Sequence, residues 1–386
     1  MSSAGVFEVA VVGGGLVGAA VAFGLRSLGP KLVLLDEGDV AHRAARANFG
    51  LIWVQGKGAG FPPYADWTQQ SASEWPRLAN DLLRETGIDV ALAQSGGVHV
   101  CLSTAELERR VAMLEAQQAQ PGFRRYSIEA LDRAQLASRL PGLGPDVAGG
   151  TYCPIDGHCN PLKLLHALHA ATIRAGAVYR ADHAVAKITP RAGHFVLDTP
   201  GGSFTAGKVV LAAGLGNAAL APTIGLSAPV RPNHGQIFVL ERVPRFLPLP
   251  LSTIRQTDEG TVLIGDSQQE RGLDDSCATE VIAAMAARAL RVFPALQRTR
   301  VLRAWAGLRV MTPDTFPIYE QSATHTGAFV ATCHSGVTLA AAHAYALAPA
   351  VDAGVLPKSF GPFAAARFTT SAKERAGMGG GGAPPR

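Results

Sequence analysis

The chain has 386 residues, of which 47% are hydrophobic and 17% charged, and its formal net charge is +5 at pH 7. This composition excludes a largely disordered chain, and the length suits roughly two to three domains, with two as the starting expectation. The basic residues are scattered and no recognition motif accompanies them, so we do not expect nucleic-acid binding.

The first predicted elements are a strand, a turn, a helix and a second strand. An apolar run at 6–12 precedes three glycines at 13–15 and an Ala- and Leu-rich stretch at 16–28. A second β-type run at 31–35 ends at the acidic pair Asp36-Glu37. The pattern predicts a parallel βαβ unit with a right-handed crossover.

The glycines of this unit have the spacing Gly13-x-Gly15-x-x-Gly18, which is typical of a dinucleotide-binding turn when it follows a strand and begins a helix. The first glycine permits the tight turn, the second lets the backbone approach a pyrophosphate, and the third allows close packing of helix on strand. A plain glycine turn is the alternative.

An acidic residue ends the second predicted strand. Asp36 lies 23 residues after Gly13, where a carboxylate accepts hydrogen bonds from ribose hydroxyls, and Glu37 is the competing candidate. A solvated surface acid is the alternative for either residue. An acid at this place also disfavours a 2′-phosphate, and therefore NADP.

The middle of the chain changes character twice. Residues 62–140 have a helical, amphipathic pattern that suits a substrate-covering segment, and a Gly/Pro cluster at 141–150 marks a boundary. Further on, 161–175 is a predicted helix and 208–212 a buried strand. Alternating runs within 230–305 indicate an antiparallel sheet.

Three elements favour FAD over NAD. The loop 48–51 lies soon after the ribose acid, where an extended dinucleotide would bring its flavin end, and the strand 209–214 runs into small residues. The third is a strand at 329–332, followed by Cys333-His334-Ser335-Gly336 and an apolar helix. The start of that helix, capped by Ser335, would stabilise negative charge on reduced flavin by about 1–2 kcal/mol. An ordinary last helix is the alternative.

The order of these elements resembles the D-amino-acid oxidase and glycine oxidase superfamily over about residues 6–360. The stretch 46–58 is similar to the flavin-proximal stretch of the branch that contains the B subunit of opine oxidase. That branch is related to the β subunit of D-hydroxyproline dehydrogenase and to the C subunit of hydrogen cyanide synthase. Further segments that carry the likeness are 156–158, 160–162, 231–232, 235–236 and 334–338.

The resemblance implies an FAD enzyme that dehydrogenates an amino acid, imino acid or opine. Hydride would pass from the carbon bearing the nitrogen to flavin N5, and water would hydrolyse the resulting imine. It also implies a heteromer in which an α subunit accepts the electrons. A stand-alone oxidase that uses oxygen and a non-catalytic dinucleotide-binding subunit are the alternatives.

Three residues are catalytic candidates. Arg309 resembles the family arginine that holds the substrate carboxylate, which a planar guanidinium grips through two parallel hydrogen bonds, and a salt bridge is the alternative. His234 is a candidate base or a structural histidine. Lys57 either tunes the flavin or is a solvated loop lysine.

The predicted architecture is α/β plus α+β, with a Rossmann-type FAD-binding domain and a discontinuous second domain built on an antiparallel sheet. The expected boundaries are 1–80, 145–225 and 306–366 for the FAD-binding domain, 81–144 and 226–305 for the substrate domain, and 367–386 for a disordered tail. The predicted cofactor-binding residues are Val12, Gly13, Gly15, Leu16, Val17, Gly18, Asp36, Glu37, Arg46, Ala47, Asn48, Gly50, Leu51, Val185, Ala212, Ala213, Gly214, His334, Ser335, Gly336, Val337 and Thr338.

No metal and no membrane span are expected. Cys153 and Cys159 lie close in sequence but have no second pair at ligand spacing, and the odd number of cysteines favours a reducing compartment. No stretch after the glycine turn reaches 18 uninterrupted apolar residues. We therefore expect a cytoplasmic protein, held at the inner membrane, if at all, through partners.

Overall fold

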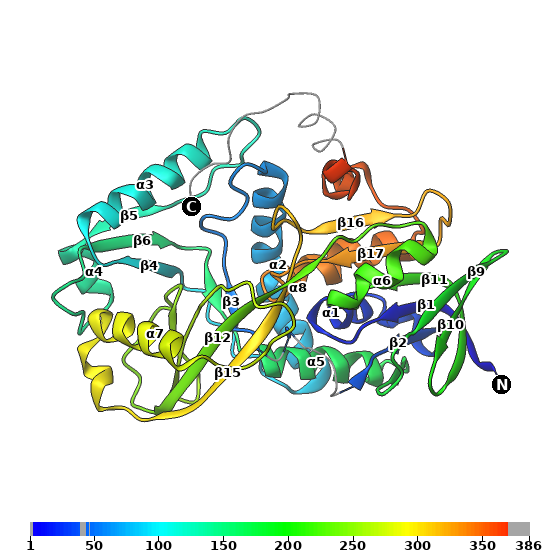
Figure 1. The fold of residues 1–386 in the computed structure, drawn as a ribbon, viewed down its shortest axis with the longest axis horizontal. Helices are drawn as coiled ribbons and strands as arrows, with labels where there is room; N and C mark the ends of the chain where they lie inside the picture. The colour runs from blue at the N-terminus through cyan, green and yellow to red at the C-terminus, as the bar shows by residue number, and fades with distance from the viewer. Residues whose placement is uncertain (1–2, 39–43, 46, 370–386) are drawn as a thin grey trace.

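The computed structural model describes residues 3–38, 44–45 and 47–369. Its larger sheet has the strand order β16-β17-β11-β1-β2-β8, with β10 paired to β11 and β9 to β10 (Figure 1). The interior pairs β17-β11, β11-β1, β1-β2 and β2-β8 are parallel. The strands are β1 (Ser3–Val12), β2 (Leu32–Leu35), β8 (Val178–Arg180), β9 (Lys187–Arg191), β10 (His194–Thr199), β11 (Gly202–Leu211), β16 (Ile318–Gln321) and β17 (Ala328–Thr332).

Helices from four parts of the chain share one buried core beside this sheet. They are α1 (Leu16–Gly24), α2 (Pro62–Thr86) and α5 (Pro161–Arg174), followed near the C-terminal end by α8 (Ala340–Ala342). The buried faces of α1, α2 and α5 are apolar at helical spacing, which is why these segments cover one another.

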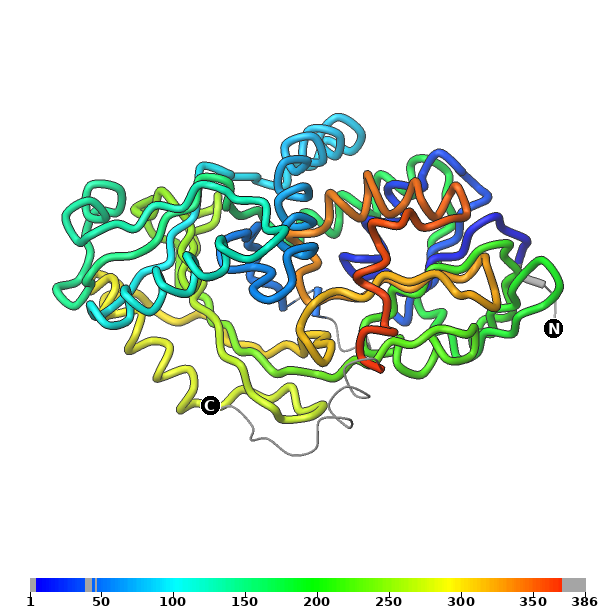
Figure 2. The backbone as a smooth tube through the Cα atoms, turned by 90° about the horizontal axis from the view of Figure 1, so that it is seen from above, coloured from blue at the N-terminus to red at the C-terminus, as the bar shows by residue number. Residues whose placement is uncertain are grey.

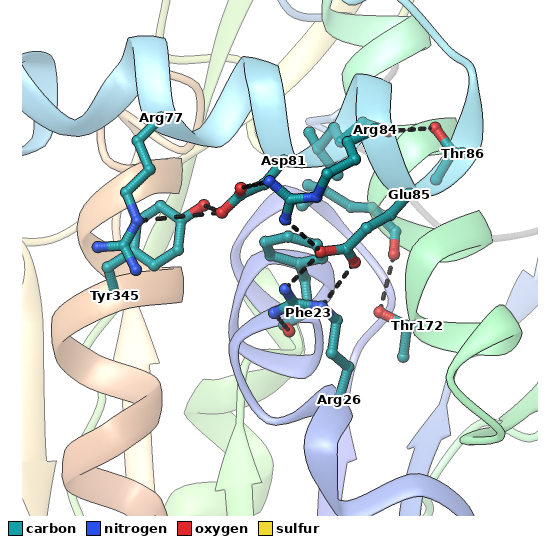
Figure 3. Close-up of polar contacts among 11 residues, drawn as sticks. Phe23, Arg26, Arg77, Asp81, Arg84, Glu85, Thr86, Thr172 and Tyr345 are labelled. Atoms are coloured by element: carbon teal, nitrogen blue, oxygen red, sulfur yellow. Dashed lines mark hydrogen bonds and ion pairs between the residues drawn. The ribbon is translucent and has the colours of Figure 1, made fainter.

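Polar contacts at the rim of this core join the same helices (Figure 3). Both carboxylate oxygens of Glu85 on α2 accept hydrogen bonds from Arg26, at 2.8 and 2.7 Å, just beyond α1. Tyr345 donates to Asp81 at 2.7 Å from the π-helical turn His343–Leu347. The three segments are therefore tied by charge as well as by packing.

The other half of the molecule contains two smaller antiparallel sheets (Figure 1). The four-stranded sheet has the order β13-β14-β12-β15, and α7 (Thr279–Val292) packs beside it. Its strands are β12 (Arg231–Arg242), β13 (Ile254–Gln256), β14 (Thr261–Ile264) and β15 (Val301–Met311). The long strands β12 and β15 run from this half toward the larger sheet.

The three-stranded sheet has the order β4-β6-β5 and shares its core with the four-stranded one. Figure 2 shows the segment after α2 beside the segment near residues 250–300 at one end of the molecule. The elements here are β4 (Gly97–Cys101), α3 (Thr104–Gln118), β5 (Glu129–Asp132), α4 (Arg133–Arg139) and β6 (Gly149–Cys153). A two-stranded sheet pairs β3 (Leu51–Ile52) with β7 (Gly157–His158).

The fold class predicted from the sequence is confirmed: a mixed, mainly parallel sheet with helices stands beside separate antiparallel sheets. Several local expectations were wrong. Residues 62–140 are not helical throughout, because β4 and β5 pair with β6, which begins at the end of the Gly/Pro cluster. That pairing also places the first strand of the segment 145–225 in the three-stranded sheet. The first helix ends at Gly24, and a 3₁₀ segment follows.

Among residues 3–38, 44–45 and 47–369, no helix is both long and apolar enough to cross a membrane.

Candidate functional site

A cavity of about 470 Å³ opens where the parallel strands end and the glycine turn begins. The turn contributes a contiguous part of its wall. The lining residues from this turn and its flanks are Val12, Gly13, Gly15, Leu16 and Val17.

Glycine suits each of the three positions of the turn for a different structural reason. Gly13 has a φ of +103°, which disfavours a side chain. A Cβ at Gly15 would have Ala45 as its nearest neighbour at 3.9 Å, so Gly15 leaves open space at the cavity. A Cβ at Gly18 would lie 1.8 Å from the carbonyl oxygen of Gly13, so α1 can approach the turn only with glycine there.

Asp36 and Glu37, which follow β2, also line the cavity, but they differ in how far they are buried. Asp36 is 6% exposed, and its carboxylate accepts hydrogen bonds from the amides of Gly14 at 2.5 Å and Gly38 at 3.0 Å. Glu37 is exposed. Asp36 therefore has the fixed orientation that a ribose-binding acid needs.

The opposite wall comes from later strands. Ala212, Ala213 and Gly214 line the cavity directly after β11, together with Val185 and Asn48. These small residues let a bound molecule pass close to the backbone.

Thr332 supplies a test of whether a polar cofactor suits this cavity. It ends β17 and lines the wall, but its hydroxyl is buried and has no hydrogen-bond partner in the described part of the chain. A buried hydroxyl without a partner is costly, so it points to a polar ligand. The glycine turn, Asp36 and Thr332 together fit a dinucleotide.

Several predicted cofactor residues are not among those that line the cavity. Arg46 lies outside the described residues. Ala47 packs against Gly307: a Cβ added at Gly307 would lie 2.1 Å from the methyl group of Ala47. Gly50 has a φ of +88° and Leu51 pairs with His158 in the two-stranded sheet.

The segment after β17 differs from the expected helix cap. His334 and Gly336 line the cavity, whereas Ser335 does not. Regular helix begins only at Ala340, without a side-chain cap. The Ser335 hydroxyl instead accepts hydrogen bonds from Tyr64 at 2.8 Å and from Lys57 at 3.0 Å. The prediction that Ser335 caps the helix was wrong, because these distant donors meet its hydroxyl first.

Val337 and Thr338 lie in the turn between this segment and the helix, and both are buried. The Thr338 hydroxyl accepts from the amide of Trp53 at 3.2 Å and donates to the carbonyl of Leu51 at 3.3 Å. Thr338 thus attaches the C-terminal segment to the loop that leads to Lys57.

Lys57 is partly buried, with its amine directed into the protein. Besides Ser335, the Nζ atom lies 3.3 Å from Nε2 of His334. Burial lowers the pKa of Lys57 to about 8, and burial followed by the charge of Lys57 holds the pKa of His334 well below its usual value. The site therefore contains a neutral imidazole beside an amine that loses its proton near pH 8, which is not the environment of a solvated loop lysine.

Arg309 lies on β15, next to β12. Its guanidinium forms an ion pair with Asp266 at 3.0 Å and donates to the carbonyl oxygen of Ser267 at 2.8 Å. A Cβ at Gly235 would lie 2.1 Å from Nη1 of Arg309, so this glycine makes room for the guanidinium. The charge of Arg309 also lowers the pKa values of Lys57 and His334, which brings all three residues into one electrostatic site.

His234 is placed differently from the other candidates. It is fully buried, and its two ring nitrogens lie 3.2 Å from Oε1 of Gln269 and 2.9 Å from the carbonyl oxygen of Ser276. A base needs a nitrogen that faces the substrate, and both are occupied here. The geometry favours the structural alternative.

One group of potential metal ligands occurs among the described residues, at His99, Cys101 and Glu106, with ligand atoms within 4.8 Å of one another. Both carboxylate oxygens of Glu106 are already engaged, by Arg288 at 2.5 Å and by the amide of Leu102 at 2.8 Å. A divalent cation could bind here only if the hydrogen bond between Arg288 and Glu106 were broken.

A glycine turn, a buried acid and a parallel sheet converge on one cavity, and a cluster of titratable groups lies beside it. This fold and this cavity define the class of dinucleotide-dependent α/β enzymes. Residues 8–350 match the family described as FAD dependent oxidoreductase. The chain belongs to this family and is an FAD-dependent oxidoreductase.

Two relatives are similar in sequence to this chain over almost its full length. The B subunit of opine oxidase from Agrobacterium tumefaciens (strain Ach5) is 46% identical over 94% of this chain and 97% of its own length. The protein of the same name from Rhizobium meliloti is 46% identical over 95% and 99%. The crystal structure of glycine oxidase from Geobacillus kaustophilus has a TM-score of 0.83 at 26% identity, covering 90% of this chain and 95% of that one.

Proposed function

We propose that this enzyme dehydrogenates the C–N bond of an amino acid, imino acid or opine. The observation that supports the proposal most is that the amine of Lys57 lies 3.3 Å from His334, which lines the cavity, and that the charge of Arg309 acts on both residues. FAD, when bound, supplies the two-electron acceptor. The names of the relatives point to the same substrate classes.

Arg309 binds the substrate carboxylate in this proposal. Its present partner is Asp266, whose side chain is 44% exposed, while that of Arg309 is 22% exposed. An incoming carboxylate can therefore take the place of Asp266 without opening the core. The contacts of Nη1 with Ser267 and Asn233 hold the guanidinium in its plane while the partner changes.

Lys57 accepts the proton of the substrate ammonium group. Only a neutral amine can do so, and burial makes that form accessible near pH 8. Ser335, itself held by Tyr64, fixes the Nζ atom, and His334 offers a neutral nitrogen as a second contact. The nitrogen lone pair of the substrate is then free to assist loss of hydride from the neighbouring carbon.

The test is anaerobic mixing of the yellow holoenzyme with opines, hydroxyprolines and simple amino acids. Bleaching of the flavin absorbance by one of these classes is the expected result. If none of them bleaches the flavin while dithionite does, the dehydrogenase proposal is wrong and a non-catalytic dinucleotide-binding role gains.

We also propose that the chain is the β subunit of a heteromer and passes electrons to an α subunit, because both relatives at 46% identity are named as one subunit of opine oxidase. A cytoplasmic location remains a prediction. Dye reduction without oxygen uptake by the isolated chain supports the heteromer. Rapid peroxide formation would instead indicate a stand-alone oxidase.

A further inference from the structure

A buried carboxyl group that the proposed reaction does not use lies behind the loop that carries Lys57. Asp156, between β6 and β7, is 0% exposed. Its Oδ1 accepts a hydrogen bond from the amide of Val54 at 2.6 Å, and its Oδ2 accepts from the side-chain amide of Gln55 at 2.8 Å. These partners lie three and two residues before Lys57. A buried acid is costly unless its oxygens are occupied, so this arrangement is a built one.

The side chain of Gln55 connects Asp156 to the substrate half of the molecule. Its oxygen accepts hydrogen bonds from Arg110 of α3 at 3.1 Å and from Thr151 of β6 at 2.8 Å. Its nitrogen donates to Gly97 at 3.2 Å as well as to Asp156. The orientation of the amide is thus determined on both sides, oxygen toward Arg110 and nitrogen toward Asp156.

The remaining backbone of the loop is held from the same half. Tyr126 accepts from the amide of Gly56 at 3.1 Å and donates to the carbonyl of Val54 at 3.2 Å. Gln117 of α3 donates to the carbonyl oxygen of Lys57 itself. The amine of Lys57, in contrast, contacts Ser335 and His334 of the C-terminal segment. The loop therefore carries its amine from one half of the molecule into the other.

We propose that Asp156 is a positioning residue, which together with Gln55 holds the loop 54–57 so that the amine of Lys57 stays on Ser335 beside the cavity. The catalytic consequence rests on the proposed role of Lys57, but the positioning itself does not. Asp156 touches neither the cavity nor Arg309. It acts through the hydrogen bonds of the loop and, as an anion, through its charge, which raises the pKa of Lys57 against the effect of burial.

The test substitutes Asp156→Asn. Its new amide nitrogen would face the nitrogen of Gln55, and turning Gln55 to relieve this would place a donor against Arg110 and Thr151. The first readout is the rate at which an amine-labelling reagent modifies Lys57 in the FAD-loaded protein without substrate, followed by peptide mass spectrometry. The reaction is run at pH 10, where Lys57 is neutral with or without the charge of Asp156, so that the rate reports exposure of the amine and not its pKa. We expect labelling of Lys57 to rise about tenfold as the amine leaves Ser335.

The second readout is flavin reduction by the best substrate across pH. We expect kcat to fall by about 10-fold to 100-fold with little change in KM, because the carboxylate clamp at Arg309 is untouched. Asp81→Asn is the matched control, since it removes a mostly buried carboxylate that binds Tyr345 far from the loop. It should change neither Lys57 labelling nor the pH profile.

Each outcome decides between the two proposals. Equal Lys57 labelling in Asp156→Asn and Asp81→Asn would overturn the positioning role. Increased labelling with unchanged rates would uphold the positioning role and refute the proposed function of Lys57. If Asp156→Asn does not fold, Gln55→Met removes the same link from its other end and the same criteria apply to it.

Discussion

Individual residues at the site owe their chemistry to their surroundings more than to their type. Lys57 and Arg309 are both basic residues, but their surroundings differ. Burial lowers the pKa of Lys57 to about 8, and its amine contacts the uncharged side chains of Ser335 and His334. Arg309 keeps a carboxylate partner in Asp266. One of them is therefore suited to accept a proton and the other to bind an anion.

Replacement of Arg309 by Ala should raise KM for carboxylate substrates far more than it weakens FAD binding. Loss of one partner of a desolvated charge pair costs about 2–5 kcal/mol. Steady-state kinetics and a flavin titration measure the two effects separately. Arg303→Ala, an exposed arginine on the same strand, is the control. Unchanged KM in Arg309→Ala would remove this residue from the substrate site.

The rate of flavin reduction should rise as pH increases through about 8, because the neutral form of Lys57 appears above its pKa. Lys57→Met should lose this pH dependence and about 10²-fold to 10⁴-fold in rate. Stopped-flow reduction at pH 6 to 10 tests both statements. A pH limb that persists in the variant would assign the proton transfer to another group.

Among the elements, the turn between β1 and α1 shows most clearly how local geometry serves the site. Gly15 and Gly18 are three residues apart on one turn, yet one faces the cavity and the other faces the backbone of Gly13. A methyl group added at Gly15 would therefore enter the cavity, whereas one added at Gly18 would clash with the backbone.

The variants Gly15→Ala and Gly18→Ala should separate binding from folding. At Gly15 the methyl group enters open space at the cavity, so we expect FAD binding weakened by about 1–3 kcal/mol and little change in the melting temperature of the apoprotein. At Gly18 the methyl group would lie 1.8 Å from a carbonyl oxygen, so the apoprotein itself should melt earlier. Calorimetry and flavin titration check the pair, and equal behaviour of the two variants contradicts the assignment.

The whole molecule has two halves whose strands and loops cross at the cavity. β12 and β15 bring Arg309 from the antiparallel half, and the loop before α2 brings Lys57, while the parallel sheet supplies the turn and Asp36. The cavity wall is therefore assembled from segments spread over most of the chain, and a molecule bound there should hold these segments together.

FAD should accordingly stabilise the folded chain by mass action. At a free concentration one hundred times its dissociation constant, the gain is about 2.7 kcal/mol. The melting temperature of the apoprotein should rise steadily as FAD is added, whereas NADP at the same concentration should have no effect. A melting temperature that does not depend on FAD would contradict the placement of the cofactor in this cavity.

Several predictions needed only neighbouring residues, and these agree with the structure. The glycine spacing, the acid at the end of β2 and the strand before Cys333 depend on local backbone rules. The three-stranded sheet could not be predicted this way, because β6 lies across the Gly/Pro cluster from β4 and β5. Nor could Tyr64, Asp156 and Asp266 be found as site residues, since their partners are 43 to 271 positions distant.

The sequence by itself determined the class of cofactor, since a turn that accepts a pyrophosphate needs glycines at given positions of one short segment. It also indicated Arg309, through the likeness of its surrounding residues to a known family. Only the tertiary structure decided that the amine of Lys57 is directed into the protein, that Ser335 holds it instead of capping a helix, and that both ring nitrogens of His234 face polar atoms of the protein. Burial and hydrogen-bond partners set these properties, and both arise from packing between segments that are far apart in the chain.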